Sequence, residues 1–181
     1  DDPRLKATIY YNYPGATLYG QSFQTAYATE LGKKGIKKYG NGESGRPDEK
    51  DWRSGINERL MRYADVLMMY AECQNELDNR ASCAQYIQMV RDRASMPDRE
   101  AEFAALSKQA MRDVIAHERA LEFALEGHRF DDIRRWGWLD NPTKLAMLKA
   151  HDPEFNSYVP GGEYFSIPQA EIDVNKNLVQ N

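Results

Sequence analysis

The apolar side chains follow a helical period from about residue 58 onward. Between residues 58 and 78 they recur every three or four positions, and acidic side chains gather on the opposite side. Residues 82–94 repeat this pattern, with Ser82 as the expected N-cap. Because the link between the two segments is short, we expect them to pack antiparallel as a helical hairpin.

The helical pattern continues beyond the hairpin. We expect a short helix at 98–106, a long helix from Ser107 to Gly127, further helical turns at 128–137 and a small helix at 141–150. The last residues, 164–181, contain a proline and many turn formers, which predicts an extended segment on the surface.

Residues 1–57 have a different character. They are rich in glycine and tyrosine and carry no long helical period. We expect them to form an irregular segment of loops and short strands packed on the helical region 58–181. The predicted fold class is therefore mainly α, with irregular loops and little short strand.

The centre of the long helix holds a charge. Glu118 lies in the middle of its apolar stripe, and Glu122 lies close beside it. A buried carboxylate is tolerated only when it is paired, because its desolvation costs several kcal/mol. The predicted structural ion pair joins Glu118 to Arg62 or Arg91. Further candidate partners are Arg93, Arg134 and Arg135.

A catalytic interpretation competes with this structural one. Glu118 with Glu122, or Asp131 with Asp132, could act as the acid and base of a glycosidase. The spacing of the acidic residues to Arg129, Arg134 and Arg135 is that of helix-stabilising ion pairs, which favours structure over chemistry.

Metal and cofactor motifs do not occur in the sequence. The pair His117-Glu118 resembles the start of a zinc-protease motif, but Leu121 stands where the second histidine would be. We therefore expect no metal, no cofactor and no enzymatic activity.

Composition narrows the class of protein further. The 181 residues suffice for one domain, and 41% hydrophobic with 29% charged residues is globular composition. The net charge of −4 gives no basic surface for nucleic acid. No apolar run reaches the length of a membrane span.

Four separated segments together resemble one family. They are "RLMRYADVLMMYAECQNEL" (59–77), "VRDRA" (90–94), "HERALEFALEGHRFDDIRRWG" (117–137) and "YFSIPQAEIDVNKNLVQN" (164–181). Their order resembles that of the SusD/RagB family, surface lipoproteins of Bacteroidetes that capture nutrients. "DPRL" at 2–5 is also similar to a family segment.

The resemblance implies tetratricopeptide-like helical hairpins and a non-catalytic role. It implies binding of an oligosaccharide, or of a peptide in RagB-like members, and delivery to a SusC-like TonB-dependent transporter. It also implies a lipid anchor on the external face of the outer membrane. The matching segments are those of the family's C-terminal end, so the remaining N-terminal part, including the anchor, would lie outside this chain. The alternative is a helical-repeat docking module without its own small-molecule site.

Two further expectations follow from this resemblance. Surface export permits disulfides, and Cys73 and Cys83 lie at similar heights on the predicted hairpin, as a candidate disulfide or as two buried thiols. Aromatic rings in irregular structure are candidates for stacking on sugars. The candidate ligand-binding residues are Tyr11, Tyr13, Tyr19 and Trp52; the alternative is that such rings pin the loops onto the helices.

Overall fold

The computed structural model describes residues 2–18, 20–40, 56–57 and 59–180. The chain divides into two compact units, Asp1–Gly127 and His128–Asn181. The sequence pattern suggested a boundary after residue 57, at the onset of the helical period. The N-terminal segment belongs to the same unit as the helices because Arg4 and Lys38 form ion pairs with acidic residues near the end of the long helix.

Short elements make up the N-terminal segment. They are α1 (Pro3–Thr8), β1 (Ile9–Tyr10), β2 (Thr17–Leu18), β3 (Gln21–Ser22), α2 (Phe23–Ala26) and β4 (Gly35–Ile36). β1 pairs antiparallel with β4, and β2 with β3. The two short helices were not predicted. Each has a side-chain cap, since Asp2 accepts from the Arg4 amide and Ser22 accepts from the Thr25 amide.

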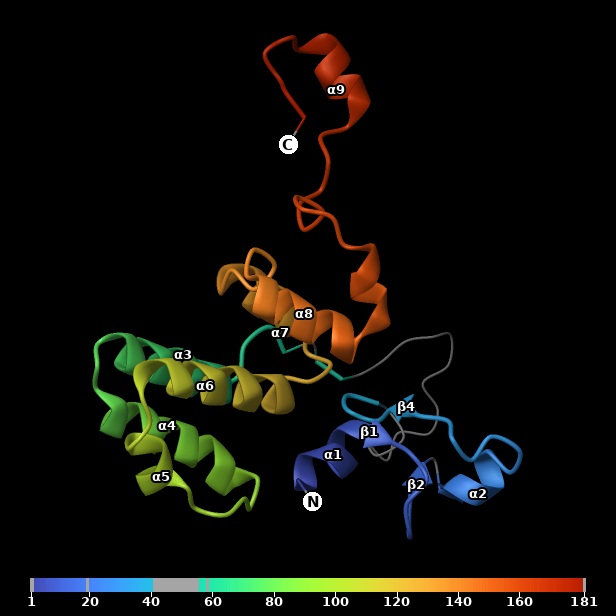
Figure 1. The fold of residues 1–181 in the computed structure, drawn as a ribbon. Helices are drawn as coiled ribbons and strands as arrows, with labels where there is room; N and C mark the ends of the chain where they lie inside the picture. Colours follow the sequence, from blue (N-terminus) through green and yellow to red (C-terminus); the bar gives the residue numbers. More distant parts are fainter. Residues whose placement is uncertain (1, 19, 41–55, 58, 181) are drawn as a thin grey trace. The chain divides into compact units, whose positions relative to one another are not determined.

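Four further helices lie in the described residues of the first unit (Figure 1). They are α3 (Tyr63–Glu76), α4 (Arg80–Arg93), α5 (Glu100–Ala104) and α6 (Lys108–Glu122). α3 packs against both α4 and α6, and α4 also packs against α5. The core between them contains Met68, Ala71, Ile87, Met111 and Ile115, all of which are buried. The predicted antiparallel hairpin is the α3–α4 pair.

Helix ends differ from the sequence prediction where caps decide them. α3 begins at Tyr63, because Arg62 has extended backbone angles. α4 begins at Arg80, because the side chain of Asn79 accepts the Ser82 amide and replaces Ser82 as the cap. Ser107 caps α6 as predicted, but α6 ends at Glu122, before Leu125 takes a positive φ of 65°.

The second unit consists of α7 (His128–Arg135), α8 (Pro142–His151), the 3-10 helix η2 (Pro153–Ser157) and α9 (Gln169–Val174). Its buried apolar side chains include Ile133, Trp138, Leu139 and Leu148. The prediction of an extended segment at 164–181 is wrong in part, because Gln169–Val174 is helical.

The predicted fold class, mainly α with tetratricopeptide-like hairpins and little short strand, is confirmed. Each strand in the described part of the chain has only two residues. Across the same described residues, no helix has the length and apolar character needed to cross a lipid bilayer.

Candidate functional site

A group of ion pairs, here called the ion cluster, surrounds the C-terminal half of α6. Its acidic members are Asp2, Glu118, Glu122 and Glu126, and its basic members are Arg4, Lys38, Arg62, Arg91 and Arg93. The side chain of Glu118 is only 3% exposed. It accepts hydrogen bonds from Arg91 Nη1 at 2.5 Å and from Arg4 Nη2 at 3.1 Å. The buried charge is thus held by two guanidinium groups.

Arg62 occupies a different position from the one predicted. It was expected as a partner of Glu118, but it donates to Glu122 Oε1 at 2.9 Å and to Glu126 Oε2 at 2.7 Å. Arg62 precedes α3 and reaches only the end of α6 and the loop after it. Arg91, the other predicted partner, does contact Glu118.

The other arginines that were candidate partners of Glu118 also pair with different acidic residues. Arg93 donates to Glu122 at 2.8 Å. Arg134 and Arg135, also candidates for Glu118, pair within their own helix α7 with Asp131 at 3.8 Å and Asp132 at 2.8 Å. Their spacing along one helix explains these local pairs. Arg4 was not foreseen as a partner.

The ion cluster argues against Glu118 and Glu122 as the acid and base of a glycosidase. A general acid or base must reach a substrate proton within hydrogen-bond distance. Glu118 and Glu122 are buried, and both carboxylates accept hydrogen bonds from arginines. This arrangement favours a structural role for both residues. Among the described residues, no three histidine, cysteine, aspartate or glutamate side chains gather where they could hold a metal ion.

Glu126 connects the ion cluster to a pocket. Burial raises the pKa of its carboxyl, but hydrogen bonds from Arg62 and Lys38 outweigh this effect, so its pKa lies below the ordinary value. The Lys38 ammonium also donates to the backbone carbonyls of Glu122 at 2.9 Å and Ala124 at 3.3 Å. The basic run at 33–38 therefore contributes one lysine to the ion cluster.

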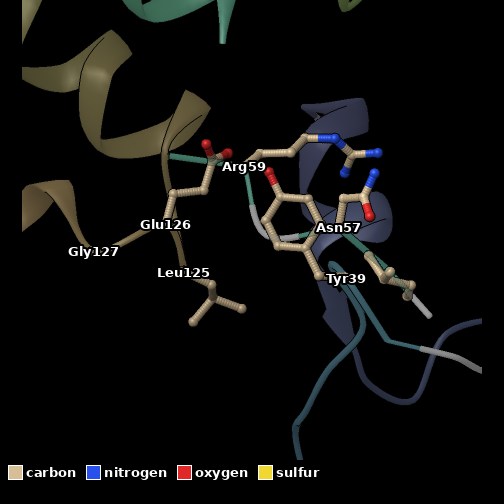
Figure 2. Close-up of a pocket in the computed structure, with 7 residues that line it drawn as sticks. Tyr39, Asn57, Arg59, Leu125, Glu126 and Gly127 are labelled. Atoms are coloured by element: carbon tan, nitrogen blue, oxygen red, sulfur yellow. The ribbon is translucent and has the colours of Figure 1, made fainter. Parts of the chain in front are cut away.

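The pocket has a volume of about 460 Å³. Figure 2 shows Tyr39, Asn57 and Arg59 on one side of it and Leu125, Glu126 and Gly127 on the other. Ile56 completes the lining. Small-molecule pockets have volumes of about 300–1,000 Å³ and combine apolar walls with a few polar groups, and this pocket has both properties. It is the candidate ligand site that the described residues form.

Tyr39 is held in this pocket by a tight turn. The Gly40 amide donates to the Lys37 carbonyl at 2.9 Å, and Tyr39 stands at the third position of the turn with a φ of 59°. That position favours glycine, and a side chain there costs about 1–3 kcal/mol. The amides of Lys37 and Lys38 both donate to the Thr8 carbonyl, which fixes the turn against the end of α1.

The predicted ligand-binding tyrosines lie on the edge of an aromatic cluster. Tyr11 and Tyr13 are half-buried, and their ring centroids are 4.8 Å apart. Tyr13 packs against the buried cluster formed by Tyr10, Ala16 and Phe23. The structure thus brings Tyr11 and Tyr13 together, whereas Tyr19 and Trp52 lie outside the described residues.

The cysteines are free thiols in this structure, in place of the candidate disulfide. Cys73 is exposed, whereas Cys83 is buried in the core of the hairpin. The side chains therefore lie on different faces of their helices. Burial raises the pKa of the Cys83 thiol to about 12.

Sequence reasoning missed the pocket residues Tyr39 and Arg59. Only a weak signal was available, since "KKYG" at 37–40 is a turn whose third residue is a tyrosine. Arg59 lies in a stretch assigned to a helix, although α3 begins only at Tyr63.

Comparisons with known proteins agree with the fold. Two curated proteins of Formosa agariphila are similar in sequence. SusD-like protein P25 is 38% identical over 125 residues, which cover 69% of this chain and 24% of that protein. SusD-like protein P2 is 29% identical over 133 residues, which cover 71% and 26%. The chain thus spans about a quarter of the length of these relatives.

Solved structures show the same relationship. A SusD superfamily protein from Bacteroides vulgatus superimposes with a TM-score of 0.83 at 30% identity, over 99% of this chain and 39% of that one. A SusD-like protein from Bacteroides fragilis, at 22% identity and a TM-score of 0.54, shares the fold. The profile of the SusD family matches residues 1–181. The resemblance stated from the four sequence segments is thereby confirmed, and the chain belongs to the SusD family.

Proposed function

We propose that this chain is part of a non-catalytic cell-surface protein that binds oligosaccharide or peptide nutrients and delivers them to a SusC-like TonB-dependent transporter. The observation that carries the proposal is the match of the SusD family over residues 1–181. The pocket between Tyr39 and Glu126 supports binding, because it combines an aromatic ring with polar groups. The arginine-bound state of Glu118 and Glu122 supports the absence of hydrolysis.

A ligand screen tests this proposal. The natural gene product is heated with panels of oligosaccharides and short peptides, and its melting temperature is recorded. A ligand at about 100 times its Kd should raise the melting temperature by about 5–10 °C, because it binds only the folded state. Chromatography of the ligand afterwards should show it unchanged. Failure of every compound to stabilise the protein, or cleavage of the ligand, would contradict the proposal.

The proposal includes a longer protein that is lipid-anchored on the external face of the outer membrane. This chain would be its C-terminal portion. An exposed apolar face of the α3–α4 hairpin supports the presence of a packed neighbour. Tyr63 is 70% exposed and Val66 is 42% exposed, and Tyr70 on the same helix stacks edge-on against Tyr86 of α4. Stacked helical repeats bury such faces against the next repeat.

Replacing Val66 with lysine should destabilise the natural gene product by about 2 kcal/mol or more, because a packed neighbour would bury the new charge. Urea unfolding measures the effect. Leu31→Lys is the control, since Leu31 is 50% exposed and lies outside this hairpin. A change of no more than about 0.5 kcal/mol in both variants would mean that no repeat covers the hairpin.

A second candidate function is docking of a separate protein through the same face. It is favoured by the exposure of Tyr63 and Val66. Unchanged stability of the Val66→Lys variant, together with loss of co-purification with the transporter, would support docking over intramolecular packing.

A further inference from the structure

The acidic side chain of the pocket is compensated within the protein. Both carboxylate oxygens of Glu126 accept from Arg62, at 2.7 and 2.8 Å, and one also pairs with Lys38. The side chain of Glu126 is only 3% exposed. Its negative charge is therefore neutralised before any ligand arrives, and Glu126 offers no free anion to the pocket.

The basic side chain of the pocket is not compensated in this way. Arg59 is exposed, and its guanidinium carbon lies 5.2 Å from the centroid of the Tyr39 ring. No carboxylate among the described residues lies within ion-pair distance of Arg59. In the neighbouring ion cluster the basic members outnumber the acidic ones. The pocket thus presents a positive charge with unused N–H donors, placed on an aromatic ring.

Backbone strain marks the same pocket. Tyr39 and Leu125 both line it, and both have positive φ values, of 59° and 65°. Residues other than glycine rarely adopt a positive φ, and those that do cluster at ligand sites. Leu125 follows the end of α6, where a left-handed residue is common, but Tyr39 stands in a turn that glycine would fit better. An ordinary solvated arginine on a protein surface would not be accompanied by two residues with strained backbone conformations.

We propose that this pocket binds an acidic oligosaccharide, with Arg59 contacting a carboxylate or sulfate of the sugar. The planar guanidinium donates two parallel hydrogen bonds to such a group. The Tyr39 ring lines the pocket beside Arg59 and adds apolar surface for the sugar ring, and the Asn57 amide lies on the same side to bond hydroxyl groups (Figure 2). This inference rests on the proposed nutrient-binding function and specifies its ligand class.

The test compares an acidic oligosaccharide with its uncharged methyl ester. The natural gene product is titrated by calorimetry with an oligogalacturonide and with the same compound as its full methyl ester, which removes the charge. The acid should bind about 10–100-fold more tightly, because a hydrogen bond between charged groups is lost in the ester. This preference should weaken as salt is added.

Two variants assign the effect to the pocket. Arg59→Gln should abolish the preference for the acid and leave the ester unaffected. Tyr39→Gly should weaken both forms, and it should fold, because glycine adopts a φ of 59° without strain. Arg80→Gln is the control and should bind as the wild type. Arg80 begins α4 beside Asp78, which pairs with Lys108 at the start of α6, whereas the pocket lies after the end of α6.

The outcomes separate this inference from the proposed function. Equal affinity for acid and ester would overturn the anionic contact and leave nutrient binding intact. Binding of an acidic peptide, but not of the acidic sugar, with the same dependence on Arg59 would overturn the oligosaccharide class. Glycan binding that Tyr39→Gly does not weaken would exclude the pocket. Absence of all glycan and peptide binding, by contrast, would defeat the proposed function itself.

Discussion

Replacing Glu118 with glutamine is expected to lower the free energy of unfolding by about 3–5 kcal/mol. Arg91 and Arg4 contact this carboxylate, and their side chains are almost fully buried. Glutamine fills the same space but brings no charge. Arg91 would keep its desolvation cost without its counter-charge, and Arg4 would retain only its ion pairs with Asp2 and Glu122. Urea unfolding followed by circular dichroism gives the difference.

The matched control for this experiment is Glu102→Gln. Glu102 also pairs with an arginine, Arg99, but both side chains are about half exposed. Solvent screens such a pair, so its loss should lower the free energy of unfolding far less than the loss of the Glu118 carboxylate does. Similar small effects in both variants would show that Glu118 is solvated, and its catalytic interpretation would regain support.

Replacing Phe23 with alanine is expected to cost about 3–5 kcal/mol of unfolding free energy. Phe23 is fully buried, and its ring centroid lies 5.1 Å from those of both Tyr10 and Tyr27. Removing the ring leaves a cavity and takes away the ring contacts with both tyrosines. The loss is measured by the same unfolding experiment.

Phe165→Ala provides the comparison for Phe23, because Phe165 is fully exposed. It should change stability by no more than about 0.5 kcal/mol. An equally small effect at Phe23 would mean that the N-terminal segment is not packed on this aromatic cluster. In that case Tyr11 and Tyr13, at its edge, would lose their support as a preformed ligand surface.

The helices of this chain could be located from its sequence because their apolar stripes are regular. The ends were less certain, since they depend on single side chains. Arg62 stays extended before α3, and Asn79 caps α4 three residues before the predicted N-cap, Ser82. α9 was missed because short helices carry too few turns for a period to show.

The candidate site could be predicted only in its local part. The central position of Glu118 on an apolar stripe correctly indicated burial. Its partner Arg4 lies 114 residues away, and a helical period carries no information about which distant segment packs against a helix. The pocket was missed for the same reason, since Tyr39 and Glu126 meet only in the tertiary structure.

The ion cluster should respond differently to the loss of a basic residue and to the loss of an acidic one. Glu122 pairs with Arg62, Arg93 and Arg4, and Glu126 pairs with Arg62 and Lys38, so each of these glutamates has two or three basic partners. These bases come from separate segments of the chain. Loss of one base, such as the largely exposed Arg93, leaves Glu122 with the others, whereas loss of one acid leaves several cations facing each other. The cluster is therefore robust to change at its arginines and fragile at its glutamates.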